Sequence, residues 1–284
     1  MQAILLFGGL TYTTIFDDTW EFSKATGWKQ LKPSVSPPAL AGAAMAYDPT
    51  TKTVVLFGGN MSNASSDETW TWDGVTWTRQ FPPVSPSARE FNGNGMVFDS
   101  AIGKVVLFGG DQYGPTNFMN DTWEWDGQSK TWTEKFPADS PSPRQATLGY
   151  DEISKQVLLF GGFTQGYVYY GDTWTYDGFD WTQQQPTTLP PPRCDNALVF
   201  DPSLKSVVLF GGLAGPCESC DEGRLNDTWL WGGTNWTQAQ PPASPSPRSG
   251  MSFDYDETMK GMLLFGGWIS PAQFTDTNWF LGVR

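Results

Sequence analysis

Apolar runs recur along the chain at a nearly constant interval, and each run ends in Phe-Gly-Gly. The runs are continuously apolar, as in Val54-Val55-Leu56-Phe57, which is typical of a strand buried on both faces. The interval of about 50 residues indicates a repeated structural unit. The second glycines of the six copies are Gly9, Gly59, Gly110, Gly162, Gly212 and Gly267.

A tryptophan-bearing segment follows each apolar run, and a second one follows it in five of the six copies. In the first, an acidic residue and Thr precede the Trp, as in Asp121-Thr122-Trp123, and the last copy varies as Asp276-Thr277-Asn278-Trp279. Both segments alternate apolar with polar positions, which predicts strands with one buried face. Because the tryptophans hold the same place in every copy, we expect them in the interfaces between units rather than on a sugar-binding surface. The second Trp of five copies is Trp28, Trp77, Trp132, Trp181 or Trp236.

A short strand rich in small residues precedes the apolar run in all copies but the first, so a complete unit has four strands. Such a small sheet cannot bury both faces alone, and radial packing of the copies solves this. The sequence therefore predicts one all-β domain over residues 1–284, a six-bladed β-propeller of four-stranded antiparallel blades with the first and last blades incomplete. A longer parent protein could supply the missing strands, the terminal blades could be atypical, or a larger ring could be cut to six. The units run approximately over 1–38, 39–88, 89–143, 144–192, 193–247 and 248–284.

The paired glycines, the acidic residue with its Trp and the second Trp together resemble the kelch repeat, over essentially the whole chain. The segments Asn226-Asp227-Thr228-Trp229 and Ser244-Pro245-Ser246-Pro247-Arg248 are similar to kelch arrays in secreted or surface proteins of bacteria and archaea. Two kelch enzyme types, galactose oxidase and the proteins of glucosinolate breakdown, hold their metals with histidines. This chain has no histidine, so the resemblance implies the fold without those activities.

The absence of histidine also removes the commonest general base and most catalytic metal sites. We therefore expect a protein that is not an enzyme and that uses no metal and no cofactor. One catalytic alternative is a sialidase-like carbohydrate-active enzyme, in which an arginine cluster clamps a sugar carboxylate and a Tyr takes part in the chemistry. The Asp-Gly turns of the chain do not match the spacing of the sialidase Asp box.

The net charge narrows the range of partners. Lys and Arg number 17 against 30 Asp and Glu, giving a net charge of −13, which repels nucleic acid and anionic lipid. No apolar run approaches the roughly 20 residues that span a bilayer. We expect neither a nucleic acid partner nor direct membrane insertion. The low charge density and a calculated pI of 4.3 favour an extracellular or cell-surface location.

The loops that join the second and third strands emerge at the same end of the ring as the connections between blades. They differ most between copies, and variable loops on a rigid scaffold are the usual place for function. We predict a non-catalytic module of a secreted or cell-surface protein that binds a protein or a glycan there. The alternative is a purely structural disc in a larger surface protein or assembly. The candidate contacts are Tyr113, Tyr167, Tyr169 and Trp268.

Four arginines open the innermost strand of their blades at this same end. They could form a cationic collar that binds a carboxylate ligand, or each could pair with an acidic residue of its own or the next blade. These candidate binding residues are Arg89, Arg144, Arg193 and Arg248.

Three cysteines and five sequons complete the candidate chemistry. Cys194, Cys217 and Cys220 are candidates for one local disulfide, with free thiols as the alternative, because a closed zinc site would need a fourth ligand. The sequons are possible glycosylation sites if the chain is secreted. They lie at Asn60, Asn63, Asn120, Asn226 and Asn235.

Overall fold

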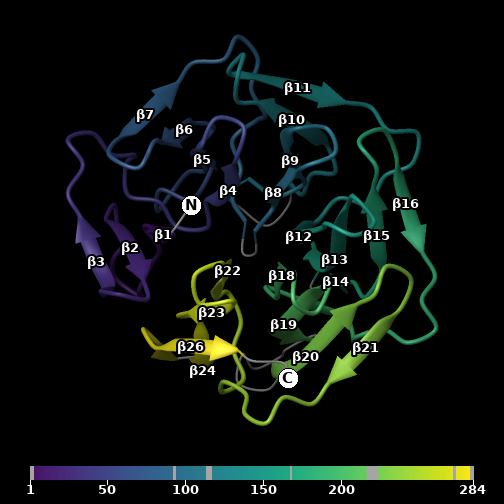
Figure 1. Ribbon diagram of the computed structural model, residues 1–284. Helices are drawn as coiled ribbons and strands as arrows, with labels where there is room; N and C mark the ends of the chain where they lie inside the picture. Colours follow the sequence, from purple (N-terminus) through teal and green to yellow (C-terminus); the bar gives the residue numbers. More distant parts are fainter. Residues whose placement is uncertain are drawn as a thin grey trace.

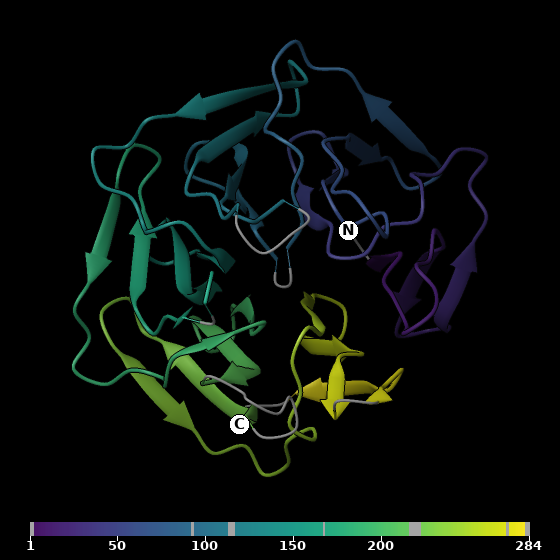
Figure 2. The ribbon, with the colours of Figure 1, turned by 180° about the vertical axis from the view of Figure 1, so that it is seen from behind.

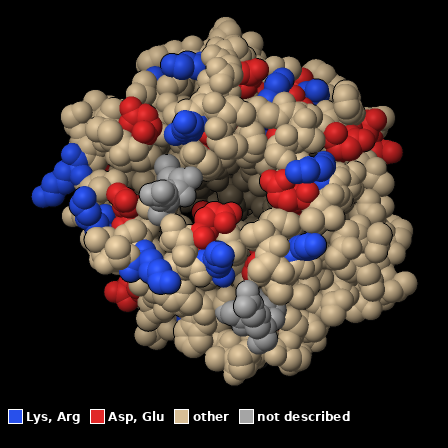
Figure 3. All heavy atoms as spheres, viewed as in Figure 1, with Lys and Arg blue, Asp and Glu red and all other residues tan. Residues whose placement is uncertain are grey.

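The chain forms a ring of six small antiparallel sheets (Figures 1 and 2), and the space-filling view shows a hollow at its centre (Figure 3). A computed structural model describes residues 3–91, 94–112, 117–166, 168–215, 223–270 and 273–281. No helix in these ranges is long and apolar enough to cross a membrane. The predicted six-bladed β-propeller is confirmed. Within a blade we name the strands a to d, from the central hollow outward.

The second and third blades show the complete unit, with four strands that pair in sequence order. Strand a lines the centre and strand d lies on the outer rim (Figure 1). Blade 2 consists of β4 (Ala44–Asp48), β5 (Thr53–Phe57), β6 (Thr69–Trp72) and β7 (Trp77–Gln80). Blade 3 consists of β8 (Met96–Asp99), β9 (Lys104–Phe108), β10 (Thr122–Asp126) and β11 (Thr131–Lys135).

The fourth and fifth blades have longer b strands and each carries one additional short strand. Blade 4 consists of β12 (Gln145–Asp151), β13 (Gln156–Thr164), β14 (Val168–Tyr169), β15 (Thr173–Tyr176) and β16 (Trp181–Gln184). Blade 5 consists of β17 (Arg193–Cys194), β18 (Ala197–Asp201), β19 (Ser206–Ala214), β20 (Arg224–Trp231) and β21 (Trp236–Ala239).

The first and sixth blades each have a three-stranded main sheet in the described residues, as predicted. Over residues 3–281, with the gaps given above, no strand a pairs in blade 1 and no strand d pairs in blade 6. Blade 1 consists of β1 (Ile4–Phe7), β2 (Thr19–Ser23) and β3 (Gly27–Leu31). Blade 6 consists of β22 (Ser252–Asp256), β23 (Gly261–Phe265) and β26 (Asn278–Leu281), with β24 (Trp268–Ser270) and β25 (Gln273–Phe274) forming a hairpin between strands b and c.

The tryptophans of strand d lock neighbouring blades together. Trp132 of blade 3, for example, packs edge-on against Phe57 of blade 2 at 5.4 Å between ring centroids and donates from Nε1 to Thr69 Oγ1 at 2.9 Å. Trp77, Trp181 and Trp236 make the same two contacts with their preceding blades. All four are buried, so their predicted place in the blade interfaces is confirmed.

Contacts of the same kind join the sixth blade to the first, between residues that are 250 positions apart in sequence. Trp28 packs at 4.9 Å against Phe265 and donates from Nε1 to Asn278 Oδ1 at 2.6 Å. Asn278 holds the place that Thr occupies in the other blades. This contact brings the two ends of the array together as one more blade interface.

The hairpin between strands a and b contains an Asp and a Lys four residues apart in four of the blades. In blade 2, Asp48 Oδ1 accepts hydrogen bonds from the backbone N–H of Thr50 and Thr51 at 2.8 and 3.4 Å. Lys52 then adopts a φ of 59°, which closes the turn. Because Asp side chains favour such turns, these residues have a structural role.

Candidate functional site

The connections between strands b and c and the connections between blades meet at one end of the ring, which we call the loop face. Backbone bonds tie the two sets together: Gly59 N donates to Arg89 O at 2.9 Å, and Arg89 N donates to Ser66 O at 3.0 Å. The Phe-Gly-Gly turn is tight because Gly58 has a φ of +75° and a Cβ there would lie 2.5 Å from Arg89 O. The loop face therefore presents variable residues on a fixed frame.

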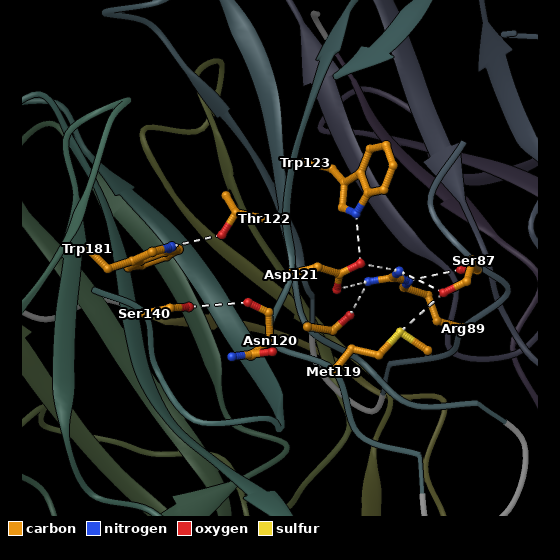
Figure 4. Close-up of polar contacts among 10 residues, drawn as sticks. Ser87, Arg89, Met119, Asn120, Asp121, Thr122, Trp123, Ser140 and Trp181 are labelled. Atoms are coloured by element: carbon orange, nitrogen blue, oxygen red, sulfur yellow. Dashed lines mark hydrogen bonds and ion pairs between the residues drawn. The ribbon is translucent and has the colours of Figure 1, made fainter. Parts of the chain in front are cut away.

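Three of the four predicted arginines form buried ion pairs with an aspartate at the start of strand c in the same blade. Arg89 donates from Nη1 and Nη2 to Asp121 Oδ1 and Oδ2 at 2.7 Å each, and Trp123 Nε1 donates to the same carboxylate at 2.7 Å (Figure 4). Arg144 with Asp172 and Trp174, and Arg193 with Asp227 and Trp229, repeat this arrangement, which we call the Arg-Asp-Trp triad.

For three of the arginines, the triads decide between the two alternatives of a cationic collar and pairing with an acidic residue. Their side chains are at most 2% exposed and their guanidinium groups donate to aspartate and to backbone carbonyls, so the pairing interpretation describes them. Burial raises the pKa of Asp121, but the hydrogen bonds and charge of Arg89 outweigh burial and hold that pKa below its usual value. The alternative of an open cationic collar is therefore wrong for Arg89, Arg144 and Arg193.

Arg248 is the exception among the four. It is 3% exposed and donates to Ser246 O, Ser246 Oγ and Gly266 O, at 3.1, 2.9 and 3.0 Å. Within the described ranges it forms no ion pair, because no carboxylate lies within 4.0 Å of its guanidinium nitrogens. Burial lowers the pKa of Arg248.

Exposed aromatic side chains gather on the loop face where blade 6 meets blade 1. Tyr12 lies 4.9 Å from Phe274 and 6.4 Å from Trp268 between ring centroids, and the last two rings meet edge-on at 5.0 Å. Tyr12 is 58% exposed and Trp268 is 36% exposed. The Arg224 guanidinium lies 5.8 Å from the ring of Trp268. We call Tyr12, Trp268 and Phe274 the aromatic cluster; it contains the predicted contact Trp268.

The second predicted aromatic contact, Tyr169, lies elsewhere on the loop face. It is half-buried and stacks on Phe163 at 6.3 Å, and Phe118 meets Phe163 edge-on at 5.4 Å. Beside it, Tyr170 stacks on the guanidinium of Arg144 at 3.6 Å from the ring centroid. The contact between Tyr170 and Arg144 could not be predicted from the sequence, because nothing in the loop of Tyr170 indicates that Arg144 packs against its ring. Tyr113, Tyr167, Cys217 and Cys220 lie outside the described residues.

The charges of two carboxylates, Glu90 of blade 3 and Asp195 of blade 5, both act on Asp111 of blade 3. Burial, opposed by a hydrogen bond from Gln145 and reinforced by the charge of Glu90, raises the pKa of Asp111 to about 7. Burial likewise raises the pKa of Asp195 to about 7 and raises the pKa of Glu90. The repeat pattern does not predict a role for these carboxylates, because each stands where the other copies carry different residues. In the described part of the chain no group of three or more Cys, Asp or Glu is arranged to hold a metal ion.

The surface around the central hollow carries both signs of charge. Figure 3 shows basic and acidic side chains interspersed around the opening on one face, without a continuous patch of either sign. A highly charged partner would therefore find no extended complementary surface there.

The cysteine and sequon predictions are only partly covered by the structure. Cys194 is a buried free thiol, and burial raises its pKa well above the usual value, so it is a poor nucleophile. The Asn235 side chain accepts a hydrogen bond from Thr188 N at 2.9 Å, which ties a blade connection in place. Asn63, Asn120 and Asn226 are exposed, and Asn60 accepts from Ser62 N at 2.6 Å. Glycosylation stays a prediction at all five.

Comparison with known proteins shows a similarity that matches this geometry. The profile of the KLHDC2/KLHL20/DRC7 Kelch-repeats domain matches residues 1–187. The F-box/kelch-repeat protein At1g51550 of Arabidopsis thaliana is 29% identical over 202 residues, which cover 63% of this chain and 40% of that protein. The chain thus spans about two fifths of the length of this relative. A particular similarity to bacterial and archaeal surface proteins stays a prediction.

Proposed function

Because this chain belongs to the kelch-repeat family, we propose that it is a non-catalytic interaction module whose loop face binds a protein partner. Kelch-repeat domains are typically protein-interaction modules. The proposal extends that general property to one surface of this ring. An extracellular location stays a prediction from composition.

The aromatic cluster is the observation that carries the proposal. Tyr and Trp are enriched at the energetic centres of protein interfaces, because they bury a large rigid area and can still hydrogen-bond. The repeat does not require these side chains: the lock between blades uses Trp28, Phe265 and Asn278, and none of the cluster. Their exposure therefore has no explanation in the packing of the ring.

The non-catalytic part of the proposal is supported by the state of the arginines. A sialidase-like site needs several guanidinium groups open to a sugar carboxylate. Arg89, Arg144 and Arg193 are buried and already hold aspartates of their own blades. Only Arg248 lacks such a carboxylate among the described residues, and one arginine does not make a clamp.

Affinity capture with three baits tests the proposed surface. The first bait is the unaltered chain, the second carries Tyr12→Ser and Trp268→Ser, and the third carries Val75→Ser and Phe179→Ser. Val75 and Phe179 are 76% and 72% exposed and lie in turns between strands c and d, at the end of the ring opposite the loop face, so they form the matched control. We expect the second bait to lose specific partners at least about thirtyfold, since the loss of even one central aromatic costs about 2 kcal/mol or more.

The opposite pattern would refute the proposal. If the second bait keeps its partners and the third loses them, the binding surface is the opposite end of the ring, where the turns between strands c and d lie. Binding of a defined oligosaccharide on a glycan array, abolished by the same Tyr12→Ser and Trp268→Ser changes, would favour the glycan alternative over a protein partner.

A further inference from the structure

Three Arg-Asp-Trp triads show which donors a carboxylate meets at the start of strand c. In blade 4, Arg144 donates to both oxygens of Asp172, and Trp174 Nε1 adds a bond of 2.8 Å to Oδ2. The same three donors surround Asp121 and Asp227. Bidentate charge-assisted bonds of this kind are the strong, geometrically specific ones.

Blade 6 has the arginine and the tryptophan of the triad but a threonine in place of the aspartate. Trp279 pairs with Leu264 in the sheet, as Trp174 pairs with Leu159 in blade 4. Gly266 N donates to Thr277 O, as Gly161 N donates to Asp172 O. Thr277 therefore occupies the aspartate position, and Asp276 lies one residue before it.

The donors of blade 6 are not used up by other carboxylates of the described chain. Arg248 is only 3% exposed, yet among the described residues it bonds to Ser246 and Gly266 alone, so the bidentate edge that holds Asp172 in blade 4 meets no carboxylate of this part of the chain. Trp279 Nε1 likewise donates to none of the described carboxylates. A buried guanidinium without an anion is costly, so an incoming carboxylate relieves that cost.

The aspartate position can be reached from solvent. In the three complete triads the aspartate side chains are 25%, 20% and 19% exposed although their arginines are buried. Thr277 is also exposed. The position lies beside the aromatic cluster, because Ser249, which follows Arg248, pairs through its backbone with Trp268 in both directions at 3.1 and 2.9 Å.

We propose that Arg248 and Trp279 bind an aspartate side chain from an extended segment of the protein partner, in the way that Asp172 is bound in blade 4. This inference rests on the proposed function and adds the chemistry that the partner presents: a carboxylate at Arg248 next to apolar side chains on the aromatic cluster. An extended segment fits because the chain's own aspartates reach their arginines from the start of a β-strand. We call this place the carboxylate slot.

A peptide titration followed by NMR tests the slot directly. The probe is the blocked peptide acetyl-Leu-Asn-Asp-Thr-Trp-amide, which copies Leu225 to Trp229 of the chain, and the control replaces its Asp by Asn. The indole N–H signal of Trp279, assigned with Trp279→Phe, should shift on adding the Asp peptide. We expect at least about tenfold weaker binding of the Asn peptide, because bonds to a charged group are lost. An Asn peptide with a free C-terminus tests whether a terminal carboxylate substitutes.

Thr277→Asp gives the matched variant, because it supplies a carboxylate from within the chain, and Thr277→Asn controls for side-chain size. Thr277→Asp should abolish binding of the Asp peptide and raise the melting temperature, whereas Thr277→Asn should retain binding. Equal binding of the Asp and Asn peptides, binding only through the free C-terminus, or full binding by Thr277→Asp would each overturn the inference.

The outcome separates this inference from the proposed function. If Thr277→Asp captures the same partners as the unaltered chain while Tyr12→Ser with Trp268→Ser does not, the carboxylate slot is wrong and the loop-face proposal stands. If the aromatic variant also keeps every partner, the proposed function itself fails.

Discussion

Trp181 Nε1 donates a hydrogen bond of 3.0 Å to Thr122 Oγ1, from the outer strand of one blade to the third strand of the blade before it (Figure 4). Both side chains are buried, and the same bond recurs between Trp77 and Thr19. A Thr hydroxyl in strand c is thus the acceptor at four of the blade interfaces. Thr228 holds this position in blade 5, but its buried Oγ1 has no hydrogen-bond partner in the described part of the chain.

This contrast predicts opposite effects for one substitution at two equivalent positions. Thr122→Val should lower the free energy of unfolding by about 1–3 kcal/mol, because it leaves a buried indole N–H without an acceptor. Thr228→Val should leave stability unchanged or raise it, because it replaces an unpaired buried hydroxyl by a methyl group. Urea unfolding of both variants gives the two values. Equal destabilisation by both would show that the Trp-to-Thr bond contributes nothing specific.

The sequence predicts the ring but not the contacts that distinguish one blade from another. The Phe-Gly-Gly runs and the tryptophans give the number of blades, because every blade is built with these residues. The partner of Trp181, in contrast, lies 59 residues away in another blade, and only the assembled ring shows it. An added residue in the last copy makes Asp276 look like the repeated acid, whereas the sheet register places Thr277 there.

The Arg-Asp-Trp triads predict a large difference between two aspartate substitutions. Asp172→Ala leaves the buried cation of Arg144 without its anion and should cost about 3 kcal/mol of folding stability. Asp18→Ala removes an acceptor of Trp20 Nε1 but breaks no ion pair of the described residues, so it should cost about 1 kcal/mol. Chemical denaturation measures both. A cost for Asp172→Ala no greater than that for Asp18→Ala would mean that the ion pairs do not stabilise the ring.

The raised carboxyl pKa values predict that the fold gains stability as the pH falls from 8 to 5. In the folded chain Asp111 and Asp195 have pKa values of about 7, against about 4 in an unfolded chain. The folded state therefore takes up protons first, and this contribution is lost as the pH rises through 7. Below pH 4 the effect reverses, because Asp121 and Asp227 have lowered pKa values and lose their ion pairs on protonation.

Asp111→Asn isolates this effect, since its amide oxygen can still accept from Gln145. The variant should melt at a higher temperature than the unaltered chain at pH 8, with a smaller rise towards pH 5. Thermal unfolding at pH 8, 7, 6 and 5 provides the comparison. Parallel pH profiles for the two proteins would contradict the assignment to Asp111.

The glycine turn predicts different costs for two Gly→Ala substitutions with similar backbone angles. At Gly58 the added Cβ would collide with Arg89 O, whereas at Gly74, with a φ of +100°, it would meet nothing within 4 Å. Gly74→Ala should cost about 1–3 kcal/mol from backbone strain alone, and Gly58→Ala should cost clearly more. Melting temperatures of the two variants decide this, and equal values would show that the close approach is relieved without penalty.

Hydrogen–deuterium exchange of the chain, alone and with a partner isolated by affinity capture, tests the central claim of a binding loop face most directly. We predict that the partner slows exchange of backbone amides in residues 10–17 and 273–277, around the aromatic cluster and Thr277. Exchange in the turns between strands c and d, at residues 73–76 and 177–180, should not change. Protection of those turns, with unchanged exchange around the aromatic cluster, would contradict the claim.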